Sequence, residues 1–130
     1  MCIGNRIFHL ARLTLAGLLL PSSGAVLAGK ADVVDATITA LGGTQYRIDA
    51  SVLHEDTGWD HYANRWDVLA PDGTELGVRE LAHPHVGEQP FTRSLTVEIP
   101  DGIDTVTIRA NDSVHELGGK TFELDVPTGE

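Results

Sequence analysis

The dominant pattern along the chain is an alternation of apolar and polar residues with a period of two. Residues 33–41 (VVDATITAL) alternate in this way, and residues 46–52 do the same after the Gly42-Gly43 turn. This is the period of a half-buried β-strand, and no stretch shows the 3.6-residue period of an amphipathic helix. The pattern therefore predicts an all-β protein.

Five further segments alternate in the same way and are separated by turn signals. The third and fifth strands each end at a Pro-Asp-Gly sequence, beginning at Pro71 and Pro100. Proline presets φ and glycine accepts a positive φ, so both sequences favour tight turns. The strands expected after the first two are 65–70, 75–81, 91–99, 106–110 and 122–126.

Seven short strands with regular turns, and Trp66 on the third, are typical of an immunoglobulin-like or fibronectin-III-like antiparallel sandwich. The chain has one cysteine, so the inter-sheet disulfide of antibody domains is excluded. A small β-barrel is the alternative fold. About 100 residues suffice for one two-layer core. Since no repeat or linker divides residues 29–130, we expect them to form a single domain.

Residues 1–28 have a different composition. Two arginines and no acidic residue accompany an apolar run over residues 13–20, and small residues follow up to Ala28. This order predicts a secretory signal peptide cleaved near Ala28, with a retained amphipathic anchor as the alternative. Cleavage would remove Cys2, the single cysteine. We therefore expect a periplasmic or secreted protein without a stable membrane anchor.

The net charge of residues 29–130 indicates which classes of molecule the protein can bind. Without residues 1–28, seven basic residues remain against nineteen acidic ones, which gives a charge of −12. A negative field of this size repels phosphate, so nucleic acid and anionic membrane surfaces are poor partners, and we expect no binding to nucleic acid. The same field attracts cations.

All five histidines after residue 28 fall in the three long connections between the predicted strands. These connections are residues 54–64, 82–90 and 111–120, and the antiparallel succession of strands places all three at one end. Imidazole is the commonest metal-ligating side chain, and several converging rings suit Zn(II) or Cu(II). The sequence therefore predicts a divalent transition metal bound by loop histidines. The candidate ligands are His54, His61, His83, His85 and His115.

The pair His83 and His85 flanks Pro84, which favours an extended conformation at His83. Residues i and i+2 of an extended chain project to the same side, so both rings can reach one ion. Carboxylates in the same loops can accept imidazole N–H groups and raise the basicity of the ligands. These are Asp60, Glu88, Asp112 and Glu116. Solvated loop histidines are the alternative, because the spacing matches no zinc-finger or HExxH pattern.

Two other features are candidates for the binding surface. Trp59 and Tyr62 either wall a ligand or pack with Trp66 beneath the long loop, and packing is favoured by the apolar area that such rings bury. Arg93 falls on the inward face of the fifth strand, where a guanidinium needs a carboxylate. We expect that partner to be Asp60, Asp67 or Glu88.

No catalytic set is present in the sequence. There is no nucleophile elbow with an ordered Ser/His/Asp set, no Gly-rich phosphate loop and no EF-hand calcium loop. We therefore expect a metal-binding protein rather than an enzyme. Two alternatives stay open: a periplasmic module that binds another protein through the same loops, and a metalloenzyme with an open coordination position.

Two resemblances follow from the loop sequences. GWDHYANRWDVLAPDG followed by HPHVGEQPFTRSL resembles a family of small exported bacterial proteins of unknown activity, over most of the chain after residue 28. HEDTGWDHYANRW is similar to the H-x5-H-Y-x-x-W stretch of superoxide reductases and desulfoferrodoxins, immunoglobulin-like domains that hold iron with four histidines and one cysteine. His54, His61 and Tyr62 match that stretch, with one extra residue between the histidines. Near its C-terminus that family has a C-N-x-H sequence, whereas this chain has Ala110 before Asn111 and reaches its histidine at His115. Because the cysteine ligand is missing here, the resemblance implies a histidine site but not superoxide reduction.

Overall fold

The computed structural model describes residues 29–128, and the predicted signal peptide lies outside the described residues. Seven strands and no helix are found over residues 29–128, and no helix there is long and apolar enough to cross a membrane. The bounds lie within two residues of the predicted ones, which confirms the all-β prediction. The strands are β1 Asp32–Gly42, β2 Gln45–Leu53, β3 Ala63–Leu69, β4 Glu75–Glu80, β5 Phe91–Glu98, β6 Thr105–Asp112 and β7 Phe122–Asp125.

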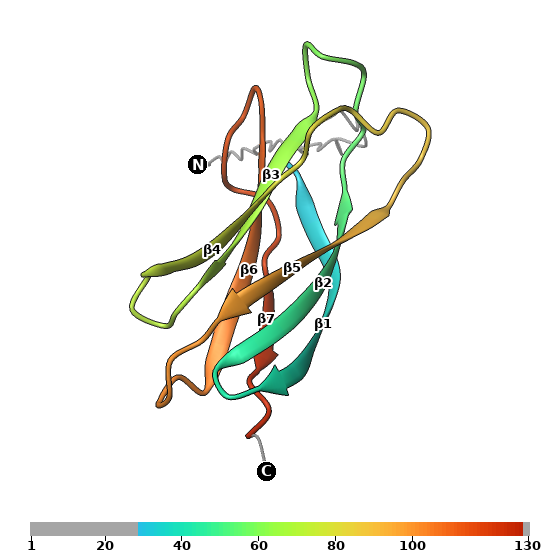
Figure 1. The fold of residues 1–130 in the computed structure, drawn as a ribbon. Helices are drawn as coiled ribbons and strands as arrows, with labels where there is room; N and C mark the ends of the chain where they lie inside the picture. Colours follow the sequence, from blue (N-terminus) through green and yellow to red (C-terminus); the bar gives the residue numbers. More distant parts are fainter. Residues whose placement is uncertain (1–28, 129–130) are drawn as a thin grey trace, which may run out of the picture.

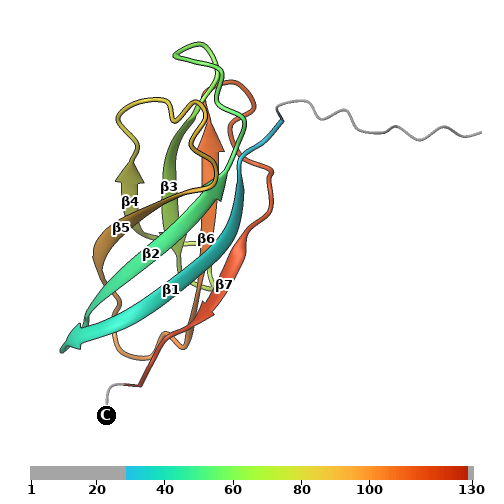
Figure 2. The same ribbon diagram turned by 90° about the vertical axis from the view of Figure 1, so that its right-hand side faces the viewer.

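The strands form two antiparallel sheets that face each other (Figure 1 and Figure 2). One sheet has the order β1-β2-β5 and the other the order β4-β3-β6-β7. Strand β4 pairs with β3, whereas constant-type immunoglobulin domains place the fourth strand beside the fifth. The chain therefore forms the predicted sandwich with this strand division, and the barrel alternative is wrong.

The core lies between the two sheets and follows from the period-two pattern. In β2 every second side chain from Tyr46 to Val52 is buried, while the intervening residues are more exposed. Trp66 on β3 and Ile108 on β6 are fully buried and face this core, as predicted for Trp66. Full burial of an isoleucine contributes about 1.5–3 kcal/mol relative to exposure, so these alternating positions hold the sheets together.

The two ends of the sandwich differ. The connections β1–β2, β3–β4 and β5–β6 are short, and the three long connections gather at the opposite end (Figure 1). Backbone hydrogen bonds tie the long loops to their neighbours: the Ser113 N–H donates to the Tyr62 carbonyl at 2.9 Å, and the Leu81 N–H to the Asn64 carbonyl at 3.0 Å. All five predicted histidines therefore lie at one end of the molecule.

Candidate metal centre

Three ligand-type atoms converge at the loop end. Nε2 of His54 lies 3.2 Å from Nε2 of His61 and 3.1 Å from Oδ2 of Asp112. The distance from His61 Nε2 to the same carboxylate oxygen is 3.2 Å. His54 follows the last residue of β2, His61 precedes β3, and Asp112 ends β6. The cluster forms because β3 and β6 are paired in a register that places Ala63 opposite Asp112.

His115 borders this cluster on its exposed side. Its Nδ1 lies 3.1 Å from Oδ2 of Asp112, and its ring centroid is 4.9 Å from that of His61. The side chain of His115 is 37% exposed, compared with 15% for His61 and 0% for Asp112. Three of the five predicted histidines, together with one predicted carboxylate, thus meet at one point.

The carboxylate of Asp112 is held by the start of the β6–β7 loop. Its Oδ1 accepts the backbone N–H groups of Val114, His115 and Glu116, while Oδ2 faces the histidine rings. Burial by itself raises the pKa of Asp112, but the N–H of His115 and the side chains of His115 and His61 outweigh it and lower the pKa to about 2. Asp112 is therefore ionised at neutral pH, and its Oδ2 presents a negative charge to the histidine rings.

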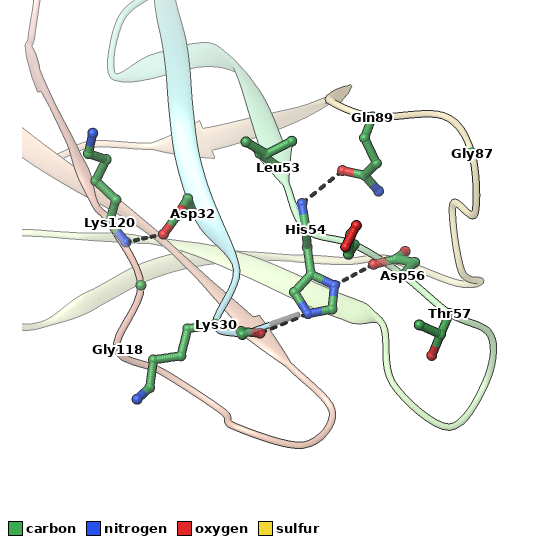
Figure 3. Close-up of a pocket in the computed structure, with 13 residues that line it drawn as sticks. Lys30, Asp32, Leu53, His54, Asp56, Thr57, Gly87, Gln89, Gly118 and Lys120 are labelled. Atoms are coloured by element: carbon green, nitrogen blue, oxygen red, sulfur yellow. Dashed lines mark hydrogen bonds and ion pairs between the residues drawn. The ribbon is translucent and has the colours of Figure 1, made fainter. Parts of the chain in front are cut away.

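His54 is buried between two carboxylates. Its Nδ1 lies 2.6 Å from Oδ1 of Asp56 (Figure 3). Its Nε2 lies 3.0 Å from the Gly29 carbonyl oxygen and 3.1 Å from Oδ2 of Asp112. The side chains of His54, Asp56 and Asp112 are all fully buried. Both ring nitrogens of His54 thus face oxygen atoms that can only accept hydrogen bonds.

His83 and His85 are not part of this cluster of His54, His61 and Asp112, and they differ from each other in burial. His85 is buried, its ring stacks on Phe91 at 3.9 Å, and its Nε2 lies 2.8 Å from Nη2 of Arg93. Burial lowers the pKa of His85, and the charges of Arg93 and His83 lower it further. His83 is exposed, with its ring centroid 4.7 Å from that of His85. The rings are close to each other, but the structure does not bring them to His61 and Asp112.

Sequence reasoning missed Asp56 and Gln89. Asp56 accepts hydrogen bonds from His54, from the Ala63 N–H at 3.1 Å and from the His85 N–H at 2.7 Å. Gln89 accepts from the His54 N–H at 2.8 Å and donates to the His85 carbonyl at 3.1 Å. Both residues fasten the β2–β3 loop to the β4–β5 loop. The one available signal was the i+2 spacing of Asp56 from His54, which is common in loops.

The other predicted carboxylates do not contact the rings. Asp60 and Glu88 are exposed, and neither carboxylate forms a hydrogen bond to a histidine ring among the described residues. Glu88 contacts His85 through the backbone, where its N–H donates to the His85 carbonyl at 3.3 Å. Glu116 contributes through its backbone alone, since its N–H and carbonyl pair with those of Asp112. Asp112 is the predicted carboxylate that the structure places in the cluster.

The structure corrects two expectations about the binding surface. Trp59 is 67% exposed and contacts Tyr62 edge-on at 5.5 Å, so it does not pack beneath the loop as Trp66 does. Arg93 was expected to pair with a carboxylate. It donates instead to the Thr92 carbonyl at 2.7 Å and to His85. Arg93 is only partly buried, so water can solvate its guanidinium and no carboxylate partner is required.

A pocket of about 970 Å³ opens beside His54, and Gln89 is among the residues that line it (Figure 3). The two lysines of the chain, Lys30 and Lys120, both line it. Asp56 and Gly87 also border the pocket. His54 is therefore shared between the pocket and the cluster.

The chain is similar to a protein from Halomicrobium mukohataei that is named "Putative lipoprotein". The two are 40% identical over 100 residues, and the match covers 77% of this chain and 49% of that protein. The chain thus spans about half the length of the curated relative that it matches. No protein-family model and no solved structure matches the chain. The comparisons do not show the likeness to superoxide reductases.

Proposed function

We propose that this chain is an exported protein that binds a divalent transition metal, Cu(II) or Zn(II), at the loop end of the sandwich. The ligand atoms are Nε2 of His54, Nε2 of His61 and Oδ2 of Asp112, which lie within 4.8 Å of one another. His115 is the additional ligand on the exposed side, because its Nδ1 faces the same carboxylate oxygen.

The observation that carries the proposal is the pair of acceptors around His54. A neutral imidazole has one N–H, and the Asp56 carboxylate at 2.6 Å from Nδ1 takes it. The lone pair on Nε2 then faces Asp112 Oδ2 and the Gly29 carbonyl. Such an arrangement is repulsive unless a positive charge lies between the atoms. A metal ion or a second proton on the ring can supply that charge.

The spacing of the three atoms fits a metal. Ligand atoms bound at about 2.0–2.1 Å from a tetrahedral ion lie about 3.3 Å from one another. The three distances among His54, His61 and Asp112 are 3.2, 3.1 and 3.2 Å. Imidazole nitrogens with one carboxylate oxygen suit Zn(II) and Cu(II). Little rearrangement of the side chains is needed for binding.

Export is supported by two observations. Residues 1–28 have the composition of a signal peptide, and the relative from Halomicrobium mukohataei is named as a lipoprotein. We place the protein in the periplasm or outside the cell. The charge of −12 that remains after residue 28 favours capture of a cation there.

A second candidate function is binding of another protein through the three loops. The observation that favours it is the exposure of one large apolar residue in each loop: Trp59 at 67%, Val86 at 61% and Val114 at 53%. Exposed tryptophan is enriched among the residues that dominate binding energy in protein interfaces. This function requires no metal, so affinity for a partner that persists in chelator and is lost in Trp59→Ala would favour it.

The first experiment is elemental analysis of the exported, untagged protein and of two matched variants. We expect about one equivalent of copper or zinc per chain in the parent. The double variant His54→Ala/His61→Ala should lose it, because two ligands are removed. His83→Ala should retain it, because His83 lies outside the cluster. No metal in the parent, with an unchanged Tm on addition of either ion, would contradict the proposal.

A further inference from the structure

We infer that Asp56 is the positioning residue of this site: it holds His54 with Nε2 toward the metal, and His85, which Arg93 contacts, in turn holds Asp56. The inference rests on the proposed metal binding and adds residues that do not ligate. It also gives the His83-Pro84-His85 sequence a role other than the one predicted from the residues alone.

The contacts of Asp56 are those of a fixed, fully desolvated carboxylate. Oδ1 lies 2.6 Å from His54 Nδ1 and accepts the Ala63 N–H at 3.1 Å. Oδ2 accepts the His85 N–H at 2.7 Å. These donors come from the β2–β3 loop, from β3 and from the β4–β5 loop. The carboxylate therefore cannot move without breaking contacts between separate elements.

His85 adds a directed dipole on the far side of Asp56. Because Arg93 Nη2 is a donor at 2.8 Å, Nε2 of His85 is the acceptor and Nδ1 carries the proton. That Nδ1 is buried, has no hydrogen-bond partner among the described residues, and lies 4.0 Å from Oδ2 of Asp56. Stacking on Phe91 fixes the plane of the ring. The positive end of the N–H bond is thus held near the carboxylate.

The consequence for His54 concerns which nitrogen binds the metal. A carboxylate on Nδ1–H fixes the tautomer, orients the ring and raises the basicity of Nε2. Nε2 is also the nitrogen that lies 3.1 Å from Asp112 and 3.2 Å from His61. Removing such a carboxylate partner commonly weakens metal binding by about 10- to 100-fold.

The test compares Asp56→Asn with Asp67→Asn. The side chains of both aspartates are fully buried, but Asp67 pairs with Arg109 in the four-stranded sheet and forms no hydrogen bond or ion pair with a histidine among the described residues. We expect the Kd for Zn(II), measured by competition with a chelator, to rise by about 10- to 100-fold in Asp56→Asn and to stay at the parent value in Asp67→Asn. The electron paramagnetic resonance spectrum of bound Cu(II) should change in Asp56→Asn alone.

The outcomes separate this inference from the proposed function. If the parent binds neither Zn(II) nor Cu(II), both the proposed function and the role of Asp56 are contradicted. If the parent binds metal and Asp56→Asn has the same Kd and Cu(II) spectrum as the parent, the role of Asp56 is contradicted but the proposed function is not. His85→Ala should weaken Zn(II) binding in the parent but not in Asp56→Asn, since it acts through that carboxylate. Equal losses in both backgrounds would remove His85 from the arrangement.

A measurement on the parent covers the case in which Asp56→Asn does not fold. In the Zn(II)-loaded, nitrogen-15-labelled protein, the NMR signals of His54 should show a protonated Nδ1 and a metal-bound Nε2. Metal on Nδ1 of His54, or a ring without a proton on Nδ1, would overturn the inference.

Discussion

His54 and Asp112 are 58 residues apart in the chain, yet Nε2 of His54 lies 3.1 Å from Oδ2 of Asp112 at the loop end of the sandwich, where both side chains are buried. Asp112 also accepts three backbone N–H groups of the loop that follows it. One carboxylate thus serves both the candidate metal centre and the fold of the β6–β7 loop. Changes at Asp112 should therefore affect metal binding and stability together.

Asp112→Asn should abolish stoichiometric metal binding and destabilise the metal-free protein. The amide removes the charged ligand and weakens the acceptor of the loop N–H groups, at a cost of about 1–3 kcal/mol. Urea unfolding in chelator measures the free energy of unfolding. Asp101→Asn, at an exposed turn on the opposite end, should change neither quantity. A metal-free stability equal to that of the parent would contradict the structural role of Asp112.

The stability of the metal-free protein should fall as the pH drops below about 6.5, in part through His85. Burial lowers the pKa of His85, with Arg93 and His83 adding to the effect, so the unfolded chain binds a proton at His85 before the folded one does. Stability from this group is complete above its unfolded pKa and is lost as the pH falls toward the folded pKa. In His85→Phe the dependence between pH 8 and pH 5 should be weaker, as measured by urea unfolding in chelator. An identical pH profile would rule out this contribution.

Glu116 adopts a left-handed backbone conformation, with φ of 61°. A residue with a Cβ is strained there, whereas glycine is not. Glu116→Gly should therefore stabilise the protein by up to about 1 kcal/mol. Glu123→Gly, in the extended strand β7, should instead destabilise it by about 0.5–1 kcal/mol. Thermal unfolding of the two variants checks the opposite signs, and destabilisation by both would show that φ at position 116 carries no strain.

The two tryptophans should respond differently to truncation. Trp59 is 67% exposed, so Trp59→Ala should change the free energy of unfolding by less than about 0.5 kcal/mol and leave metal content intact. Trp66 is fully buried, and Trp66→Ala should cost about 3–5 kcal/mol. Denaturant unfolding compares them. A large loss in Trp59→Ala would mean that its ring packs in solution.

The strands could be predicted because their information is local. Apolar alternation in residues 46–52 marks a half-buried strand whatever lies beside it, and the Pro-Asp-Gly sequences at Pro71 and Pro100 mark turns by their own backbone preferences. The succession of antiparallel strands then places every second connection at the same end. This is why the gathering of the histidines in three neighbouring loops was visible without a structure.

The composition of the cluster was not visible in this way. The sequence by itself determined the all-β sandwich and the end at which the histidines lie. Only the tertiary structure decided that His54 and His61 meet Asp112, while His85 turns toward Arg93. The physical reason is that these contacts depend on the register of β3 against β6 and on loop conformations. Residue spacing along the chain specifies neither, and the role of Asp56 appears only once three elements surround it.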